Sequence, residues 1–213
     1  MKLSSPKKGT QKRGIPIVLS APSGAGKSTI ATRIVEENPS AVLSISCTTR
    51  APRPGEKDGV NYHFTSADEF KRKIEVGEFL EWAVVHGHYY GTPLSSLEKQ
   101  MSENKDVILT IDPQGALSVK KIFSEGIFIF VVPPSWDALR ERLTKRATDD
   151  SNTIDVRIQN AKKELSYLSH YDYLVVNDNL ESAVTDVTAI LRAEHRRLSR
   201  INKNDIPLLA HGS

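Results

Sequence analysis

The sequence is poor in cysteine, since Cys47 is the only one among 213 residues. A single cysteine excludes a disulfide within the chain, and the lack of a cysteine cluster argues against a zinc site built on thiolates. A lone thiol that is buried in a reducing compartment is the usual interpretation of such a composition. We therefore expect a cytoplasmic protein.

Long hydrophobic runs are also missing. No apolar stretch approaches the roughly 18 residues that a transmembrane helix needs, and the first residues contain no apolar core of a secretory signal. The composition, 38% hydrophobic and 26% charged, is that of an ordinary globular protein. The length allows a hydrophobic core and is compatible with one domain that carries insertions. We expect no membrane partner.

Acidic residues are absent from the first 14 positions, which contain five lysines and arginines. Without these five, 24 basic residues face 26 acidic ones, so the rest of the chain is close to neutral. This balance argues against a nucleic-acid partner. We interpret residues 1–14 as a disordered basic tail, and contact with an anionic surface is the alternative.

What the sequence does contain is an alternation of short apolar runs with amphipathic segments. Buried strands are predicted in the segments IPIVLS, AVLSIS, DVILTID, IFIFVV and YLVV, with helices between them. The alternation predicts an α/β fold with a mostly parallel sheet that helices flank on both faces. Residues 47–93 interrupt it with prolines, tyrosines and strands, and we interpret them as an inserted subdomain. A capping box of Ser66 and Glu69 begins a helix there.

The stretch APSGAGKST, here called the glycine-rich loop (residues 21–29), follows the first strand directly. Gly24 and Gly26 allow the backbone to bend around an anion, and main-chain N–H groups at a helix N-terminus bind phosphate well. Lys27 can reach the β- and γ-phosphates of a nucleotide, and the Ser28 hydroxyl can ligate Mg²⁺. A glycine-rich turn without a ligand is the alternative interpretation.

Asp112 ends the apolar segment VILTID. An acid at this place lies at the carboxyl edge of the predicted sheet, where ligands bind in open α/β folds. Its carboxylate can contact a magnesium-bound water or a substrate group. Capping of the turn that follows the strand is the alternative.

Five motifs together resemble the guanylate kinase family: SAPSGAGKST, SCTTRAPRPGEKDGVNYHF, GEFLEWAVVHGHYYGT, IDPQGA and VND. They occur in the family's order and spacing, and the resemblance extends from Ile15 to about Arg197. It implies a kinase that transfers the γ-phosphoryl group of ATP to GMP with Mg²⁺, giving ADP and GDP in purine nucleotide metabolism and GMP recycling. It also implies that dGMP is an acceptor.

The resemblance further implies a P-loop NTPase core with two additions. The core consists of residues 15–46, 94–135 and 163–213. The additions are a strand-rich GMP-binding subdomain, residues 47–93, and a small helical lid, residues 136–162. Oligomeric state stays open between a monomer and a homo-oligomer.

Site residues also follow from the resemblance. ATP contacts are implied for Ala21, Pro22, Ser23, Gly24, Ala25, Gly26, Lys27, Ser28, Thr29 and Asn177, with Ser28 and waters as ligands of Mg²⁺. GMP contacts are implied for Ser46, Arg50, Arg53, Tyr62, Glu81, Tyr90, Thr92 and Asp112. Catalytic roles are implied for Lys27, Arg50, Arg142, Arg146 and Arg157.

The chemistry of these residue types agrees with the implied roles. Two arginines three residues apart, Arg50 and Arg53, can form charge-assisted hydrogen bonds with a dianionic phosphate. A carboxylate such as Glu81 can accept the N1–H and N2–H₂ donors of guanine, whereas adenine presents an acceptor at N1. No general base is required, because the attacking phosphate oxygen is already ionised at neutral pH. Without the resemblance, the ordinary interpretation of Arg50 and Arg53 is a solvated pair of side chains, and that of Glu81 is a strand residue that faces solvent.

Four positions depart from the family pattern. Ala21 stands where the loop motif usually begins with glycine, and Thr92 replaces a commoner serine. Thr110 stands where the family usually has an acid, which alters the charge near the phosphates. Ala147 replaces a glycine after the lid arginine, and it can stiffen a hinge.

Two other functions are alternatives to a guanylate kinase. A kinase of another phosphorylated small molecule, such as a ribose bisphosphate, would lack the set of Glu81, Ser46 and Thr92. A scaffolding module related to guanylate kinases would commonly lose the intact glycine-rich loop. A metal site on His86 and His88 lacks further ligands, and we expect these residues to belong to a hairpin.

Overall fold

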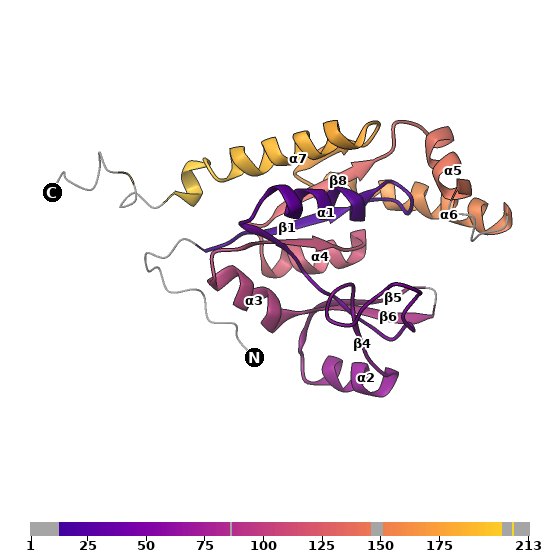
Figure 1. Cartoon of the computed structure of the whole chain (residues 1–213), viewed down its shortest axis with the longest axis horizontal. Helices are drawn as coiled ribbons and strands as arrows, with labels where there is room; N and C mark the ends of the chain where they lie inside the picture. Colours follow the sequence, from indigo (N-terminus) through magenta and orange to yellow (C-terminus); the bar gives the residue numbers. More distant parts are fainter. Residues whose placement is uncertain (1–12, 86, 146–150, 202–205, 207–213) are drawn as a thin grey trace.

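The computed structural model of the chain describes residues 13–85, 87–145, 151–201 and 206 (Figure 1). The strands are β1 (Pro16–Ser20), β2 (Ala41–Leu43), β3 (Cys47–Thr48), β4 (His63–Phe64), β5 (Phe79–Val85), β6 (His88–Pro93), β7 (Asp106–Thr110), β8 (Ile127–Val132) and β9 (Tyr173–Val176). The helices are α1 (Lys27–Glu37), α2 (Ala67–Glu75), α3 (Leu94–Ser102), α4 (Pro113–Ile122), α5 (Trp136–Lys145), α6 (Ser151–Leu165) and α7 (Leu180–Glu194).

The larger sheet is parallel and has the strand order β2-β7-β1-β8-β9. Its central strand β1 is fully apolar except for Ser20, and all of its residues are buried. A strand that is buried on both faces needs a continuous apolar sequence, and PIVLS provides it. This confirms the predicted α/β fold and places the segment after β1 at the middle of the sheet.

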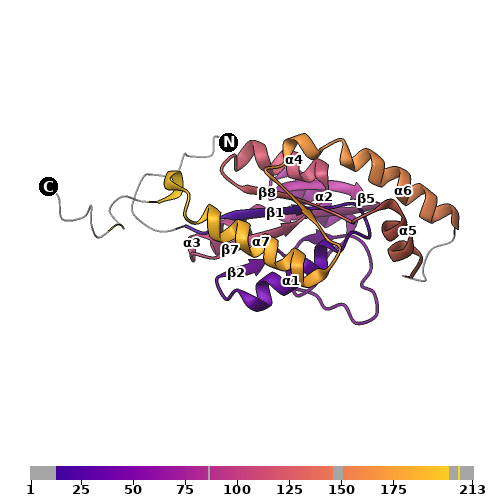
Figure 2. The ribbon, with the colours of Figure 1, turned by 90° about the horizontal axis from the view of Figure 1, so that it is seen from above.

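Helices cover both faces of this sheet, as Figures 1 and 2 show. Ile17 and Leu19 of β1 join a core cluster with apolar side chains of α1 and α7. Val18, between them, points to the opposite face and packs with side chains of α3 and α4. The alternation follows from the two-residue period of a strand. The sheet is therefore held rigidly between two apolar layers.

A second sheet has the order β4-β3-β6-β5 and belongs to the inserted subdomain, residues 47–93. Its longest pairing is the antiparallel hairpin of β5 and β6, with Glu81 opposite Thr92 and Ala83 opposite Tyr90. Helix α2 begins at the predicted Ser66 cap, where the Ser66 hydroxyl accepts a hydrogen bond from the Glu69 N–H. The Glu69 carboxylate of the predicted capping box accepts hydrogen bonds from Arg72. Phe70 of α2 is fully buried against the hairpin.

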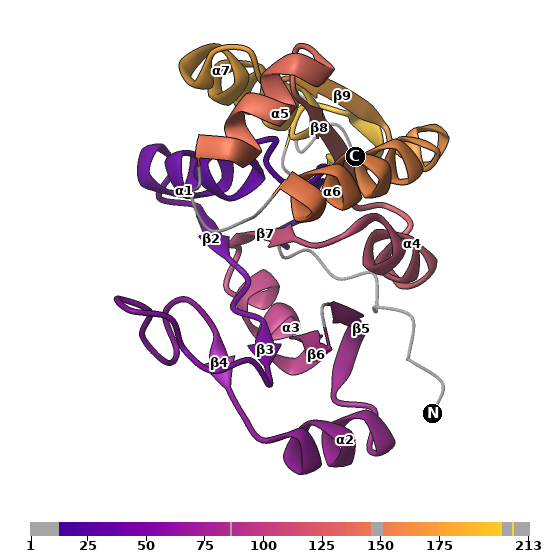
Figure 3. The same cartoon turned by 90° about the vertical axis from the view of Figure 1, so that its right-hand side faces the viewer.

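Helices α5 and α6 form a pair with an apolar cluster of their own, which contains Leu139, Leu143 and Ile158. Figure 3 shows the pair beside the five-stranded sheet, with the second sheet on the other side of β7. The two tryptophans lie in these flanking parts: Trp82 is on β5 and 47% exposed, and Trp136 begins α5 and is 43% exposed.

The sequence prediction differs from the structure at several places. Helix α3 was not predicted, and the predicted strand at residues 41–46 ends at Leu43. The sequence also predicts a final helix over residues 180–199, but α7 ends at Glu194 and a 3₁₀ turn follows at Leu198–Arg200. Residues 1–12 of the predicted tail lie outside the described residues, whereas the Gly14 N–H donates to the Met101 carbonyl over 3.0 Å.

No helix in the described part of the chain is long and apolar enough to cross a bilayer.

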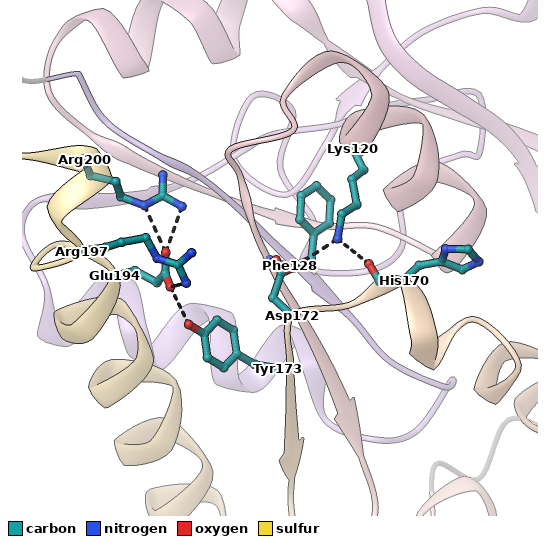
Figure 4. Close-up of polar contacts among 8 residues, drawn as sticks. All are labelled: Lys120, Phe128, His170, Asp172, Tyr173, Glu194, Arg197 and Arg200. Carbon is teal, nitrogen blue, oxygen red and sulfur yellow. Dashed lines mark hydrogen bonds and ion pairs between the residues drawn. The ribbon is translucent and has the colours of Figure 1, made fainter.

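A buried carboxylate fixes the end of α7 (Figure 4). Glu194 is 3% exposed and accepts hydrogen bonds from the Tyr173 hydroxyl and from the guanidinium groups of Arg197 and Arg200, at 2.5–3.1 Å. Burial alone would raise the pKa of Glu194, but these hydrogen bonds outweigh it, so the pKa lies below its ordinary value. The cluster connects α7 to β9 near the amino ends of the strands.

We expect Glu194→Gln to lower the free energy of unfolding by about 2 kcal/mol near pH 7, because the arginines lose a charged acceptor. The melting temperature should fall by roughly 4–8 °C. Because the pKa of Glu194 is lower in the folded chain than in the unfolded chain, the ionised carboxylate stabilises the fold at pH values above its unfolded pKa. This contribution disappears as the pH falls through the folded pKa. The difference between the two proteins should therefore shrink in acid.

The matched control is Glu141→Gln, which removes an exposed partner of Lys145. A surface ion pair contributes little, so its effect should stay within about 0.5 kcal/mol. Equal melting temperatures of the Glu194 and Glu141 variants would contradict a stabilising role for Glu194.

Candidate functional site

The predicted site residues gather at the carboxyl edge of the larger sheet. The glycine-rich loop follows β1, Asp112 comes two residues after β7, and Asn177 directly follows β9. Because β1 lies between β7 and β8, the loop occupies the centre of this edge. Ligands of open α/β sheets bind at such an edge, so the topology itself indicates a binding site.

The glycine-rich loop has backbone angles that favour glycine at two positions. Gly24 has φ of 94° and Gly26 has φ of 93°, both in the left-handed region. A Cβ on Gly24 would also lie 2.9 Å from Leu143 of α5, so the loop packs directly against that helix. Helix α1 begins at Lys27, and its first N–H groups lie at the loop. This arrangement can bind an anion.

Lys27 is anchored beside the end of β7. Its Nζ donates to the carbonyl oxygen of Ile111 over 3.0 Å. Burial lowers the pKa of Lys27, and the nearby carboxylates of Asp112, Glu164 and Glu81 oppose this shift. The negative charges near Lys27 favour its protonated form, and this positive charge at the loop can attract phosphate oxygens.

Asp112 is the N-cap of α4. Its Oδ1 accepts hydrogen bonds from the N–H groups of Gln114 and Gly115, at 2.8 and 2.9 Å. The capping interpretation raised from the sequence is therefore confirmed for this oxygen. The side chain is half-buried at the carboxyl edge, and the predicted contact with GMP stays a prediction.

Glu81 and Thr92 form a buried polar pair in the second sheet. They lie opposite each other in the β5–β6 register, and the Thr92 hydroxyl donates to Glu81 Oε1 over 2.6 Å. Cys47 pairs with Gly91, so extending that antiparallel register by one residue brings Ser46 level with Thr92. Burial raises the pKa of Glu81 to about 7; the hydrogen bond from Thr92 opposes the rise and the charge of Asp112 adds to it.

Helix α4, which packs on the larger sheet, contacts this pair at Glu81. A Cβ on Gly115 would lie 2.7 Å from Glu81 Oε2, so a side chain there would displace the carboxylate. Gly115 is in the first turn of α4, and only glycine leaves this space. The contact brings the carboxylate of the second sheet to the edge that holds the glycine-rich loop.

Arg50 lies in a charged and aromatic cluster. Its Nη2 donates to both carboxylate oxygens of Glu56, at 2.8 and 2.9 Å, and its guanidinium lies 5.5 Å from the centre of the Tyr62 ring. Tyr62 packs edge-on against Tyr90, with 5.9 Å between ring centres. Glu56 also accepts from the Arg53 N–H over 2.7 Å. The structure thus brings the four predicted phosphate-binding residues, Arg50, Arg53, Tyr62 and Tyr90, into one region.

The predicted lid arginines are partly described. Arg142 on α5 is half-buried, and its Nη2 lies 3.4 Å from the carbonyl oxygen of Asp178. Arg157 on α6 is also half-buried. Arg146, Ala147 and His86 lie outside the described residues.

Asn177 touches the glycine-rich loop from the side of β9. The side chain is 6% exposed, and its Nδ2 donates to the Ala25 carbonyl over 2.7 Å. A Cβ on Gly26 would lie 2.2 Å from the same nitrogen. The predicted residue is therefore at the loop, and its polar side chain is already engaged there.

Three site residues were not found by sequence reasoning. Glu56 orients Arg50, and Gly115 leaves space for Glu81. The negative charge of Glu164 on α6 opposes the lowering of the Lys27 pKa. Glu56 and Gly115 lie inside quoted motifs, so a signal existed. Glu164 ends an amphipathic helix and has no local signal; burial raises its pKa to about 7.

Metal-binding clusters are missing from the described part of the chain, where no three His, Cys, Asp or Glu residues are grouped to hold an ion. Ser28 is exposed on the first turn of α1, next to Lys27. A hydroxyl oxygen is a hard ligand, and Mg²⁺ on a nucleotide needs few protein ligands.

Comparisons with known proteins agree in one family. The sequence profile described as guanylate kinase matches residues 13–194. The chain is 51% identical over 192 residues to a guanylate kinase of Clostridium perfringens, which covers 90% of this chain and 89% of that protein. It is 50% identical over 188 residues to a guanylate kinase of Thermotoga maritima, covering 88% and 91%. The crystal structure of a guanylate kinase from Anaplasma phagocytophilum superimposes with a TM-score of 0.73 at 36% identity, covering 89% of this chain and 90% of that one.

Proposed function

The chain belongs to the guanylate kinase family, and we propose from this premise how its residues carry out the reaction. The protein transfers the γ-phosphoryl group of ATP to GMP and gives ADP and GDP. The observation that carries the assignment of roles is the meeting of two polar sites at one sheet edge: the loop with Lys27, and the pair of Glu81 and Thr92.

GMP is recognised at both of its ends in this proposal. The ionised Glu81 accepts the N1–H and N2–H₂ donors of guanine, Ser46 and Thr92 supply hydroxyl groups, and adenine would leave the carboxylate facing an acceptor. Arg50, Arg53, Tyr62 and Tyr90 bind the phosphate of GMP, and Glu56 holds the first two in place. Residues 47–93 thus form the GMP-binding subdomain, and dGMP is an expected acceptor.

ATP binds through its phosphates at the glycine-rich loop, residues 21–29. Main-chain N–H groups at the start of α1 and the Lys27 ammonium contact the phosphate oxygens. Ser28 would hold Mg²⁺ together with phosphate oxygens and waters, and the ion when bound neutralises phosphate charge. Residues 15–46, 94–135 and 163–213 form the core that holds this loop.

Phosphoryl transfer in this site depends on alignment and charge. The attacking oxygen of GMP needs no base, and Lys27 stabilises negative charge on the transferred group. Arg142, Arg146 and Arg157 belong to the lid, residues 136–162, and add positive charge around the reacting groups. Closure of the lid and of the subdomain excludes water, so ATP reacts with GMP rather than with water. Both substrates are metabolic nucleotides, so we place the reaction in the cytoplasm. The protein acts there as a monomer or a homo-oligomer.

The direct test is a crystal structure with GMP and an ATP analogue, together with turnover measured for GMP, dGMP, AMP and UMP. We expect the guanine beside Glu81, the acceptor phosphate beside Arg50 and Arg53, and turnover of GMP and dGMP only. GMP bound away from these three residues, or equal turnover of AMP, would refute the assignment.

The pH dependence of GMP binding follows from the pKa of Glu81. The carboxylate must be ionised to accept two donors, and burial raises its pKa to about 7, with Asp112 adding to and Lys27 and Thr92 opposing the rise. A proton therefore competes with GMP below pH 7. We expect the KM for GMP to rise toward about tenfold per pH unit below that value, measured by initial rates.

The control is Glu81→Gln, whose KM should change with pH between about 7.5 and 6.5 only through ionisation of the GMP phosphate. The phosphate of GMP titrates near pH 6 in both proteins, so it contributes equally. A flat KM in the unsubstituted protein over this range would contradict the need for an ionised Glu81.

A further inference from the structure

Asn177 carries a polar amide but is buried, and its contacts go to the protein rather than to solvent. Its Nδ2 donates to the Ala25 carbonyl over 2.7 Å, and its main-chain N–H donates to the Val132 carbonyl at the end of β8, also over 2.7 Å. We propose that Asn177 is a positioning residue that fixes the peptide bond between Ala25 and Gly26, so that the Gly26 N–H faces the phosphates of ATP. This inference rests on the proposed function of the glycine-rich loop.

The geometry of one peptide unit carries the first step. The C=O and N–H groups of a trans peptide point in opposite directions, and no cis peptide occurs in the described residues. Asn177 holds the Ala25 carbonyl on the side of β9. The N–H of Gly26, which belongs to the same peptide unit, therefore points away from Asn177. On the side away from Asn177, an anion can accept a hydrogen bond from the Gly26 N–H.

The flexibility of glycine makes such a restraint necessary. Gly26 has φ of 93° and no Cβ, so little steric resistance opposes rotation of the Ala25–Gly26 peptide. A rotated peptide would present the Ala25 oxygen where the N–H had been, and that oxygen would repel a phosphate. The Ala25 N–H, which belongs to the preceding peptide unit, donates to the Pro22 carbonyl over 3.0 Å. The hydrogen bond from Asn177 acts on the Ala25–Gly26 peptide unit itself and opposes its rotation.

The packing around Gly26 shows how closely the same amide nitrogen approaches the loop. A Cβ at this position would lie 2.2 Å from Asn177 Nδ2, far inside van der Waals contact. The absence of a side chain on Gly26 therefore allows the amide to reach the loop. The two residues occupy the space together, although 151 positions separate them in the sequence.

Burial of the amide distinguishes this role from contact with the ATP base. A side chain that recognises a base presents its polar atoms to the nucleotide, whereas Asn177 is 6% exposed and uses its donor on Ala25. Loss of a positioning residue should slow transfer from any nucleoside triphosphate. Loss of a base contact should instead change the preference between triphosphates.

The experiment compares Asn177→Asp, Asn177→Ala and the control Asn179→Ala in the full chain. Aspartate keeps the shape but places an acceptor against the Ala25 carbonyl, and alanine removes the donor without adding charge. Asn179 caps α7 through Ser182, so its variant loses a structural hydrogen bond that does not touch the loop. Initial rates are measured with ATP and with GTP as donors, and thermal melting reports the fold.

We expect Asn177→Asp to lower kcat about 10- to 100-fold, because misplacement of reacting groups has costs of this order. The ratio of kcat/KM for ATP to that for GTP and the KM for GMP should stay within about twofold of the unsubstituted protein. Asn177→Ala should show a smaller loss of the same kind, and it provides the test if the aspartate variant does not fold. Asn179→Ala should keep kcat while melting at a lower temperature.

An unchanged kcat in both Asn177 variants would overturn the inference. So would a changed preference between ATP and GTP at constant kcat, which would assign Asn177 to the base. Failure of the unsubstituted protein to phosphorylate GMP would instead refute the proposed function, so the two failures can be told apart.

Discussion

Replacement of Lys27 by alanine is expected to lower kcat by about a thousandfold or more, because charge on the transferred phosphoryl group loses its closest fixed cation. The ammonium lies beside the end of β7, where it donates to the Ile111 carbonyl. Burial already lowers its pKa, so the folded protein gains little from keeping this charge in place. The measurement is kcat at saturating ATP and GMP, with melting temperature as a test of folding.

The control for this variant is Lys99→Ala, which removes an exposed lysine of α3. It should keep full activity and nearly the same melting temperature. If kcat of Lys27→Ala stayed within about tenfold of that of the unsubstituted protein, the loss would be too small for a side chain that contacts the transferred group. This result would contradict the role proposed for Lys27.

Replacement of Glu81 by glutamine is expected to lower kcat/KM for GMP by about a thousandfold, since a site built for hydrogen bonds rejects a partner that leaves them unmet. The glutamine amide keeps the volume but turns an NH₂ donor toward guanine donors or toward the Thr92 hydroxyl. The rate with AMP should change far less, so the preference for GMP over AMP narrows. Both rates are measured by release of ADP.

Glu78→Gln is the matched control, because Glu78 lies in the same subdomain and pairs at the surface with Arg72 and Lys73. It should retain the preference for GMP. If Glu81→Gln discriminated against AMP as strongly as the unsubstituted protein does, the guanine would have to be recognised by other residues.

Local patterns explain why much of the fold could be predicted from the sequence. The strand β1, the loop and the start of α1 follow from residues that are adjacent in the chain, and the Ser66 cap from residues three apart. Helix α3 was missed although Leu97 and Met101 are spaced by one turn and both buried. Its segment has few apolar residues, and their burial depends on the sheet against which they pack.

The site was predicted less completely, for a physical reason. The resemblance named Glu81, Arg50 and Asn177, but the contacts that hold them come from distant or unexpected partners. Gly115 of α4 meets Glu81 of the second sheet. Asn177 after β9 meets Ala25 after β1, although β8 lies between these two strands. Such contacts depend on strand order and register, and no spacing in the sequence expresses them.

The places of Trp82 and Trp136 give the molecule two optical reporters. One indole lies on the second sheet and the other at the start of the α5–α6 pair, two parts on opposite sides of β7, and each indole is partly open to water. A phenylalanine in place of either leaves a single tryptophan, since the chain has no third indole. In the proposed closure, emission from each tryptophan reports the movement of its own part, so the order of the two movements can be timed without any attached dye.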